Sequence, residues 1–555
     1  KELIAYYELK ALGGAAAVTM GDCLVDSKNG RVTKVQFPLD DTNQKGPLSS
    51  LCKAITRHGA VASLELQHGG MYARTTGEQL GYVWGPSATM LPFRPGGSPQ
   101  VKSDGKMIEV REMSEEMIEY TISRFGDAAL FAKERGFGMV MIHGGHGWLV
   151  SQFMSSKTNK RKDRWGGSLE NRMRFPLAII EDIRKKCGRD FPIEFRMSGS
   201  ECNPAGYDLD EGIRIAQMLD GKVDLIHVSA GNHEIFDVFF ITHPSMFQED
   251  GCNVKYAAEI KKHVKTPVAT VGALSDPAMM EEIIASGLAD VVELGRQTLA
   301  GPDLPIKART GREDEINQCL RCYSCFSECD ATCHFLCAIN PVIGNEYEAK
   351  FDLSPKYKKK VLVAGGGISG MQAALTCAER GHEVILCEKT AELGGILLCE
   401  EQVPFKKKLK LYLEKQKRMV ERSGIEVRLN TEVTKELAAE IAPDVIIAAM
   451  GAQPVKPRIP GIDGENVMSA QDAYTSIYKI GQNVVILGAG LVGIELGLHL
   501  ISKGKKVKII EMTDRISDGG NFLHILGLKV EIKKRGLEIE FNTKAKEITA
   551  DGVVC

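Results

Sequence analysis

A glycine-rich fingerprint that occurs twice constrains what the second half of this chain can fold into. An apolar run at 361–364 leads into GGGISG at 365–370, and the next apolar run ends at Glu388. The same order returns as an apolar run at 484–487, GAGLVG at 488–493, and Glu511. In such a strand–turn–helix unit the glycines let backbone N–H groups approach a pyrophosphate, and the acid accepts the ribose hydroxyls. The repeat predicts two dinucleotides, or one domain inserted within another.

Neighbouring segments extend this prediction. The LGG at 393–395 suits a loop that passes close to a second phosphate. A strand at 444–450 is expected to cross between the two folds, which we place at 355–460 and 461–555. Because the chain stops in mid-sheet, we expect a C-terminal portion beyond Cys555. The residues expected to hold the nucleotides are Gly365, Gly367, Gly370, Glu388, Gly395, Gly488, Gly490, Gly493 and Glu511.

A run of cysteines precedes these folds, in a segment that we place at 319–350. Six of the 15 cysteines lie between Cys319 and Cys337, three of them at C-x2-C-x2-C spacing and the last one after 11 further residues. Thiolates this close together can wrap an iron–sulfur cluster, although a zinc site accepts similar spacing. A disulfide staple is disfavoured, because the other nine cysteines are scattered along a long chain. Cys329 and Cys333 also lie in the run, so spacing alone leaves the ligand set open.

Residues 1–318 alternate β-branched runs with amphipathic segments, which predicts a parallel sheet. Strands are expected at 15–20, 61–67, 138–143, 192–198, 223–229, 267–271 and 290–294. Helices are expected at 1–12, 114–135, 169–187 and 209–219. Seven strands are one short of a (β/α)8 barrel, so we expect the first strand and its loop upstream of Lys1. An open doubly wound sheet is the alternative.

Bulk properties exclude several classes of protein. A chain of 555 residues is too long for one hydrophobic core, so about two to four domains are expected. A net charge of −2 without a basic tract does not indicate nucleic acid or an anionic membrane. No apolar run approaches the roughly 20 residues of a membrane span, and no signal-peptide pattern is present. Scattered unpaired cysteines favour a reducing cytoplasm.

In a (β/α)8 barrel the active site lies at the carboxyl ends of the strands, and phosphates bind after strands seven and eight. Those two positions hold Gly272 and Gly295, and Arg296 adds a bidentate cation. Gln67 and Arg196 end two other strands, where they can address a ring that carries carbonyls, such as an isoalloxazine. A structural ion pair is the alternative for Arg196.

The strand at 138–143 ends in HGGHGW, which places His143 and His146 on one loop. Two histidines can bind a metal or donate hydrogen bonds to a substrate carbonyl. We favour hydrogen bonding, because no carboxylate or third histidine close by in the sequence completes a metal set. His233 follows another strand and is expected at the same end of the barrel.

Taken together, these motifs resemble the old yellow enzyme family. The marks in the barrel are LQHGG at 66–70, the loop of His143 and His146, and TNKR at 158–161 with WGGSLENR at 165–172. With the cysteine run and both nucleotide folds, nearly the whole chain resembles the 2,4-dienoyl-CoA reductase / trimethylamine dehydrogenase branch. Clostridial enoate reductases and bile-acid or steroid ene-reductases belong to the same branch.

The resemblance implies FMN in the barrel, one [4Fe–4S] cluster at the junction, FAD in the first nucleotide fold and NADH in the second. Gln67 and Arg196 would contact the flavin ring, and the FMN phosphate would lie on Gly272, Gly295 and Arg296. The cluster ligands that it favours are Cys319, Cys322, Cys325 and Cys337. Glu511 would repel the extra phosphate of NADPH, which favours NADH. Arg515, close by in the sequence, leaves NADPH as the alternative nucleotide.

One position departs from the family pattern. A tyrosine usually follows H-G-x-H-G and donates the proton to the substrate α-carbon, but here the residue is Trp148. An indole N–H donates hydrogen bonds without being a practical acid. We therefore expect His233, which matches a histidine that assists protonation in the dienoyl-CoA reductases, to supply the proton.

The expected activity is reduction of an enone, enal or enoyl thioester, with electrons passing from NADH through FAD, the cluster and FMN. His143 and His146 would stabilise the enolate oxygen. Apolar residues in the loops at 77–106 and 236–253 hint at a bulky substrate such as a steroid, bile acid or flavonoid. The alternatives are oxidative demethylation of an amine, which needs an aromatic cage, and an electron-transfer module that serves a partner protein. A homo-oligomer is compatible with all three.

Overall fold

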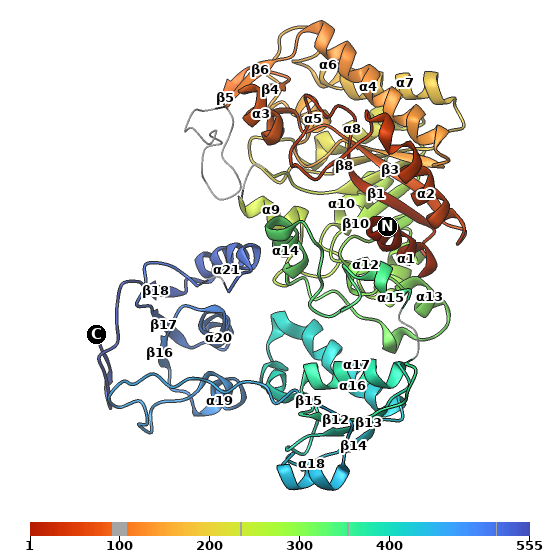
Figure 1. Ribbon diagram of the computed structural model, residues 1–555. Coiled ribbons are helices and arrows are strands. Elements are labelled where there is room, and N and C mark those ends of the chain that lie inside the picture. The colour runs from red at the N-terminus through yellow and green to blue at the C-terminus, as the bar shows by residue number, and fades with distance from the viewer. Residues whose placement is uncertain (91–107, 234–235, 352–354, 518) are drawn as a thin grey trace. The chain divides into compact units, whose positions relative to one another are not determined.

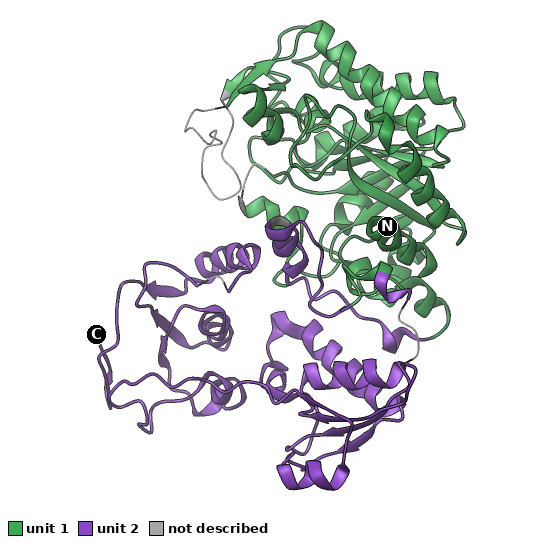
Figure 2. Cartoon of the chain, in the orientation of Figure 1, with its two compact units in different colours: residues 1–311, 342–347 green, residues 312–341, 348–555 purple. Residues whose placement is uncertain are grey.

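The computed structural model describes residues 1–90, 108–233, 236–351, 355–517 and 519–555. They form two compact units (Figure 2): unit 1 comprises Lys1–Gly311 with Val342–Tyr347, and unit 2 comprises Arg312–Pro341 with Glu348–Cys555. The cysteine run therefore belongs to unit 2, and the chain returns briefly to unit 1 directly after it.

Unit 1 is built around one sheet with the order β11-β10-β9-β8-β7-β3-β1-β2, in which every neighbouring pair is parallel. Its strands are β1 (Ala17–Leu24), β2 (Phe37–Pro38), β3 (Val61–Gln67), β7 (Met139–His143), β8 (Ile193–Ser198), β9 (Leu225–Ser229), β10 (Val268–Val271) and β11 (Val291–Glu293) (Figure 1). A doubly wound sheet reverses its strand order partway, whereas the order here follows the chain from β1 to β11. The (β/α)8 prediction is confirmed for unit 1, and the doubly wound alternative is wrong.

All seven expected strands of unit 1 are present, and β2 is an additional two-residue strand. The expected strand at 15–20 continues to Leu24 through an irregularity between Met20 and Cys23. The helices are α1 (Glu2–Leu12), α2 (Lys45–Thr56), α3 (Arg74–Leu80), α4 (Glu115–Glu134), α5 (Leu149–Met154), α6 (Leu169–Arg172), α7 (Arg174–Cys187), α8 (Leu209–Leu219), α9 (Phe236–Thr242), α10 (Val254–Lys261), α11 (Pro277–Ala285), α12 (Gln297–Ala300) and α13 (Leu304–Arg309). The expected helix at 169–187 is divided at Met173 into α6 and α7.

The two loops expected to shape the substrate pocket contain regular structure. A small sheet with the order β4-β6-β5 comprises β4 (Tyr82–Gly85), β5 (Thr89–Met90) and β6 (Glu109–Glu112). Residues 91–107 of the first loop lie outside the described residues. The second loop begins with α9, on which Phe240 is buried, while Met246 beyond it is only half-buried.

Unit 2 contains the two expected nucleotide-binding folds. The first sheet has the order β14-β13-β12-β15 and the second has the order β16-β17-β18, all of their pairs being parallel. The strands are β12 (Lys360–Ala364), β13 (Glu383–Cys387), β14 (Glu426–Arg428), β15 (Val445–Ala448), β16 (Asn483–Leu487), β17 (Lys506–Ile510), β18 (Glu538–Glu540) and a hairpin of β19 (Glu547–Thr549) and β20 (Gly552–Val554). The helices are α14 (Ser324–Thr332), α15 (Glu346–Ala349, partly in unit 1), α16 (Ile368–Glu379), α17 (Lys407–Arg422), α18 (Lys435–Ile441), α19 (Ala470–Thr475), α20 (Leu491–Ser502) and α21 (Phe522–Arg535). Within the described ranges, no helix is both long and apolar enough to cross a membrane.

Candidate active site

Four side chains, from β3, from β7 and the loop after it, and from β9, contact one another in series at the carboxyl end of the unit 1 sheet. Glu65 of β3 contacts His143 Nδ1 through its carboxylate. His143 Nε2 lies 2.8 Å from Nδ1 of His146, whose Nε2 lies 2.9 Å from the hydroxyl of Ser229. The two histidines are thus brought together as expected. Neither Glu65 nor Ser229 was singled out by the sequence, because nothing in their local patterns marks them.

Local backbone geometry holds the second histidine in this chain. His146 has φ +63° and Gly147 has φ +89°, so the loop turns sharply after β7. The His146 N–H donates to Ser198 Oγ at 3.3 Å, and the His233 N–H donates to the His146 carbonyl at 3.2 Å. A left-handed residue other than glycine persists only where such contacts over-determine it.

The charge of Glu65 determines which ring nitrogens of His143 and His146 carry protons. Burial alone would raise the Glu65 pKa, but His143, Arg196 and the Asp22 N–H lower it to about 2. An ionised Glu65 accepts the proton of His143 Nδ1, so in neutral His143 the Nε2 atom accepts from His146 Nδ1. His146 Nε2 then accepts from the Ser229 hydroxyl. The expected arrangement, two imidazoles that each offer an N–H to one substrate oxygen, is therefore not the arrangement of the described state.

Burial also makes the histidines of this region weak bases. The pKa of His146 and of His243 is well below the ordinary value, first because of burial and then because of Arg196 and neighbouring histidines. Burial, His143 and Arg196 lower the pKa of His233 to about 3. The pKa of His143 is lowered by burial, against the opposing charge of Glu65. All four imidazoles are consequently neutral near pH 7.

We expect the free energy of unfolding of this region to fall as the pH drops from 7 to 5. A histidine with a folded-state pKa below 6.5 takes up its proton only on unfolding, so its stabilisation is complete above pH 6.5 and is lost on acidification. The slope approaches about 1.4 kcal/mol per pH unit for each such histidine. Urea titrations at pH 7, 6 and 5 would measure it. His243→Phe should reduce the slope, and an unchanged slope in that variant would contradict the assignment.

Aromatic side chains surround the two histidines. The Trp148 ring centroid lies 6.1 Å from that of His143 and 5.5 Å from that of His233, edge to face in both cases. His233 stacks on His146 at 5.7 Å and on His243 at 5.1 Å. His233 therefore reaches the expected place. The sequence interpretation missed His243, because its position seven residues after α9 begins carries no motif.

A flavin ring fits the polar side chains beside this chain. The buried Arg196 Nε has no hydrogen-bond partner among the described residues, which suits a donor that awaits a carbonyl oxygen or ring nitrogen. Gln67 is 3% exposed. Burial raises the pKa of Asp22 to about 6, and a hydrogen bond from the Gln67 side chain partly opposes that rise. Glu65, two residues earlier on the same strand face, is the side chain of β3 that contacts His143.

The residues expected to hold the FMN phosphate follow β10 and β11 as predicted. Gly272 has φ +132°, and a Cβ there would lie 2.6 Å from Asn253 Nδ2, so only glycine fits. A Cβ at Gly295 would meet no atom within 4 Å among the described residues, which leaves room for a ligand. Arg296 donates from Nη2 to the Pro244 carbonyl at 2.7 Å, which fixes its guanidinium at this end of the sheet.

A second polar cluster in the sheet is charge-paired within the protein and needs no ligand. His227 Nδ1 of β9 lies 2.7 Å from Glu194 of β8 and 3.0 Å from Glu293 of β11. Despite burial, Glu293 and Glu194 raise the pKa of His227 to about 9, so it is a cation between two carboxyl groups. Its position shows that side chains from β8, β9 and β11 converge in the interior of the barrel.

The two nucleotide folds of unit 2 repeat one set of contacts. Glu388 accepts the Gly366 N–H at 2.7 Å and the Thr390 N–H at 2.9 Å. Glu511 accepts the Ala489 N–H at 2.7 Å and the Thr513 N–H at 2.8 Å. In each fold the acid thus lies against the glycine turn, where it can receive ribose hydroxyls.

Two glycines of each fingerprint are required by the backbone, one for its positive φ and one for its close packing. A Cβ at Gly370 would lie 1.8 Å from the Gly365 carbonyl oxygen, and a Cβ at Gly493 would lie 2.1 Å from that of Gly488. Gly365 and Gly488 have φ +109° and +105°. Gly367 and Gly490 begin α16 and α20 with no close atom, and Gly395 lies against Gly367, with its Cβ position 3.0 Å from the Gly367 Cα.

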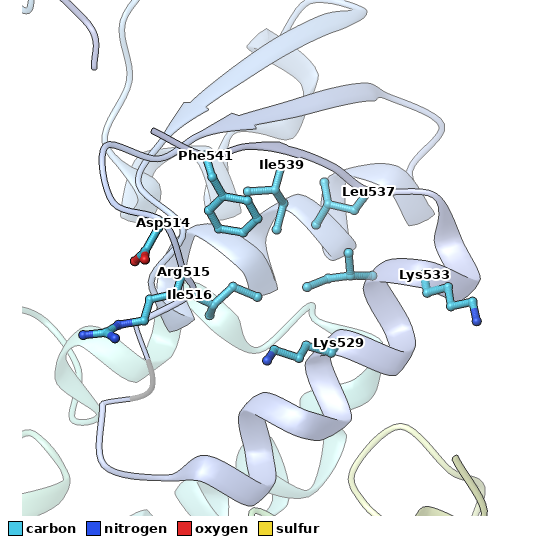
Figure 3. Close-up of a pocket in the computed structure, with 9 residues that line it drawn as sticks. Asp514, Arg515, Ile516, Lys529, Lys533, Leu537, Ile539 and Phe541 are labelled. Atoms are coloured by element: carbon cyan, nitrogen blue, oxygen red, sulfur yellow. The ribbon is translucent and has the colours of Figure 1, made fainter. Parts of the chain in front are cut away.

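A cavity of about 440 Å³ lies beyond Glu511, between the loop after β17, α21 and the chain around β18. Figure 3 shows Ile516, Leu537, Ile539 and Phe541 around its centre, whereas Lys533 points away from it. Arg515 lies on its edge. The cavity adds no contact that decides between NADH and NADPH.

Left-handed residues stand between the first three cysteines of the run. Arg321 and Tyr323 both have positive φ, 56° and 62°, and such alternating residues turn backbone N–H groups toward sulfur ligands. Burial raises the pKa of Cys337 to about 11, and the charges of Cys319 and Cys322 add to the rise. Asn521 ties the segment to α21, because its amide donates to the Cys322 carbonyl at 2.8 Å. Cys325, in the first turn of α14, is half-buried, whereas Cys333 is exposed.

A (β/α)8 barrel with polar side chains at the carboxyl ends of its strands, followed by two dinucleotide folds, is typical of a flavoenzyme that takes electrons from a pyridine nucleotide. Residues 1–315 match the NADH:flavin oxidoreductase / NADH oxidase family, and residues 359–555 match the pyridine nucleotide-disulphide oxidoreductase family. The chain belongs to the NADH:flavin oxidoreductase / NADH oxidase family and, within it, to the 2,4-dienoyl-CoA reductase / trimethylamine dehydrogenase branch. It is an NADH-dependent flavin oxidoreductase that uses FMN and FAD.

Several curated proteins and solved structures are similar to the chain over most of its length. The NADH oxidase of Thermoanaerobacter brockii is 38% identical over 100% of this chain and 84% of its own, and the cinnamate reductase of Clostridium sporogenes is 31% identical over 94% and 79%. A complex of 2-naphthoyl-CoA reductase with 2-naphthoyl-CoA is 30% identical, with a TM-score of 0.91 over 99% of this chain and 83% of that one. Histamine dehydrogenase from Rhizobium sp. 4-9 shares the fold, with a TM-score of 0.87 at 22% identity.

Proposed function

We propose that this protein reduces the C=C bond of a carbonyl-activated alkene with electrons that enter from NADH. The observation that carries the proposal is the chain Glu65–His143–His146–Ser229 beside the unpaired Arg196 Nε, at the carboxyl end of the sheet. Bound at their sites, FAD would accept hydride from NADH, a [4Fe–4S] cluster on Cys319, Cys322, Cys325 and Cys337 would carry single electrons, and FMN would supply hydride to the alkene.

The neutral chain offers no N–H to a substrate oxygen, so we infer that the negative charge developing on that oxygen draws one proton from water into the chain. Protonation of His143 beside the ionised Glu65 turns its Nε2–H toward His146 Nδ1. His146 Nε2 then carries a proton that it can donate to the substrate oxygen in place of Ser229. A donor aimed at developing negative charge in a buried site is the arrangement that lowers such barriers. The negative charge of Glu65 stabilises the protonated His143–His146 pair in the protein interior.

The apolar and aromatic lining favours a conjugated acyl substrate. Trp148 stands edge-on to His143 and His233, and Phe239 lies 5.9 Å from His233. Two relatives are named for the reduction of cinnamate and of 2-naphthoyl-CoA, both aryl-conjugated acyl compounds. We therefore extend the enone and enoyl class to aryl-substituted acids and thioesters, and we assign the α-carbon proton to the side of the site formed by Trp148 and His233.

Amine demethylation and pure electron transfer are less compatible with this site. The guanidinium of Arg196 contributes, after burial, to lowering the pKa of His143, His146 and His233, and the same positive charge disfavours a cationic amine beside these residues. A module without a substrate of its own would have no use for the buried histidine chain.

Anaerobic stopped-flow measurements test the proposal. The cluster-loaded protein would be reduced with NADH and mixed with cinnamate, an enoyl thioester, a small enone and a tertiary amine. Rapid flavin reoxidation with a saturated product is the expected result for at least one of the first three compounds. Flavin reduction by the amine, with no alkene reduced, would overturn the proposal.

A further inference from the structure

The site described so far lacks a convincing acid for the α-carbon. Trp148 occupies the place where the family pattern has a tyrosine, and an indole is not a practical acid. Burial and neighbouring positive charge keep His233 neutral, with its pKa lowered to about 3. A neutral imidazole N–H is a far weaker acid than a phenol, whose ordinary pKa is near 10. A phenol elsewhere at this end of the barrel would therefore suit the task better.

Tyr72 presents such a phenol. It ends the short 3₁₀ turn Gly70–Tyr72 directly after β3, and its hydroxyl oxygen is buried. A Cβ at Gly147 would lie 3.6 Å from Tyr72 Cε2, the ring carbon next to the one that carries the hydroxyl. The hydroxyl end of the ring, rather than its Cβ end, thus approaches the loop of His146. The Tyr72 ring lies 6.4 Å from Trp148, edge to face.

One amide fastens the turn of Tyr72 to the histidine loop. Gln152 accepts the Met71 N–H at 3.1 Å, and its Nε2 donates to the carbonyl of Gly69 at 3.1 Å and to that of Gly147 at 2.8 Å. Gln152 is 1% exposed, so these bonds are shielded from water. The positions of Tyr72 and of the His143–His146 chain are therefore mechanically coupled, as a proton donor and an oxygen-binding group would have to be.

We propose that Tyr72 is a catalytic residue that donates the proton to the substrate α-carbon, an inference that rests on the proposed alkene reduction. The β-carbon receives a hydride, whose two electrons originate from NADH and whose proton comes from solvent, because the cluster would carry electrons alone. The π bond breaks, and the α-carbon takes the proton of the Tyr72 hydroxyl. The phenolate is then reprotonated by water, so that one NADH and one proton are consumed for each alkene. Trp148 and Tyr72 together replace the single tyrosine of the family pattern.

A nitroalkene separates the two halves of this reaction, because hydride addition alone yields a nitronate that persists and absorbs in the ultraviolet. In Tyr72→Phe, reduced enzyme mixed with a nitroalkene should still be reoxidised at near the wild-type rate, while nitronate accumulates. Protonation to the nitroalkane should slow about 100-fold or more, the usual contribution of a general acid. With a cinnamate-type substrate, the same variant should lose turnover to a similar extent.

Three variants complete the design. Tyr82→Phe alters a tyrosine whose ring lies edge to face with Trp84 in the small sheet and should behave as wild type. Trp148→Tyr in the Tyr72→Phe background should restore protonation, because it returns a phenol to the same site. His233→Gln tests the competing proton donor and is measured beside Tyr72→Phe. Binding of a non-reactive enoyl analogue to the oxidised protein, followed by the shift of the flavin spectrum, should be unchanged in Tyr72→Phe.

The outcomes distinguish the two proposals. Wild-type protein that reduces no alkene would overturn the proposed function and the role of Tyr72 with it. Active wild type with normal protonation in Tyr72→Phe, or nitronate that accumulates in His233→Gln alone, would overturn the role of Tyr72 and leave alkene reduction standing. Loss of analogue binding in Tyr72→Phe would show that the residue only shapes the pocket.

Discussion

Cys337→Ser is expected to stop NADH-driven alkene reduction while leaving the reaction of NADH with the FAD-binding fold intact. In the proposed ligand set Cys337 is the fourth thiolate and comes from a separate stretch of chain, where it is half-buried. Since even the outer partners of metal ligands change metal affinity or activity by roughly 10- to 100-fold, we expect a loss at or beyond the upper end of that range. Iron content and the visible absorption of the cluster should fall in parallel.

The measurement is anaerobic turnover with NADH, compared with single-turnover reoxidation after chemical reduction of the FMN. The variant should fail in the first and retain the second, because only the route between the flavins is cut. Cys329→Ser and Cys333→Ser are the matched controls, as both lie in the same run and should keep iron and turnover. A variant of Cys329 or Cys333 that loses iron while Cys337→Ser keeps it would require a different ligand set.

Arg196→Met is expected to weaken FMN binding by about 10- to 150-fold. The change removes a guanidinium whose buried Nε has no partner among the described residues, so the flavin would lose one charge-assisted hydrogen bond. Such bonds contribute about 1.5–3 kcal/mol, and each 1.4 kcal/mol is a factor of ten in affinity. Methionine nearly preserves the apolar volume of the side chain, which limits the structural cost.

Titration of the deflavinated protein with FMN, followed by flavin fluorescence, gives the dissociation constant directly. Arg184→Met is the control, because Arg184 is bound to the Phe191 carbonyl and to Asp224 at the opposite, amino ends of β8 and β9. It should bind FMN as wild type does. Equal affinity in Arg196→Met would show that Arg196 serves the Glu65–His143 pair rather than the flavin ring.

Local sequence patterns were sufficient to predict the parts of the protein that depend on backbone conformation within one stretch of chain. The fingerprint glycines, Glu388 and Glu511 were predicted, because a strand, a glycine turn, a helix and an acid stand at fixed offsets in one stretch of chain. The strand β3 and the helix α8 were predicted to the residue for a similar reason. Their periodicity and end signals are local, and neighbouring parts of the fold do not override them.

Only the tertiary structure decided how the histidines are used. Glu65, Ser229, Gln152 and Tyr72 come from four segments whose sequences carry no shared motif, and the barrel brings them to one loop. The sequence interpretation found no carboxylate near the His143 loop, whereas Glu65 lies against it across the sheet. A parallel sheet aligns side chains by register, not by separation along the chain, so Glu65 and His143 are 78 residues apart and in contact. The sequence therefore determined the class of enzyme and its nucleotide folds, and the packing of strands determined which side chains share a proton.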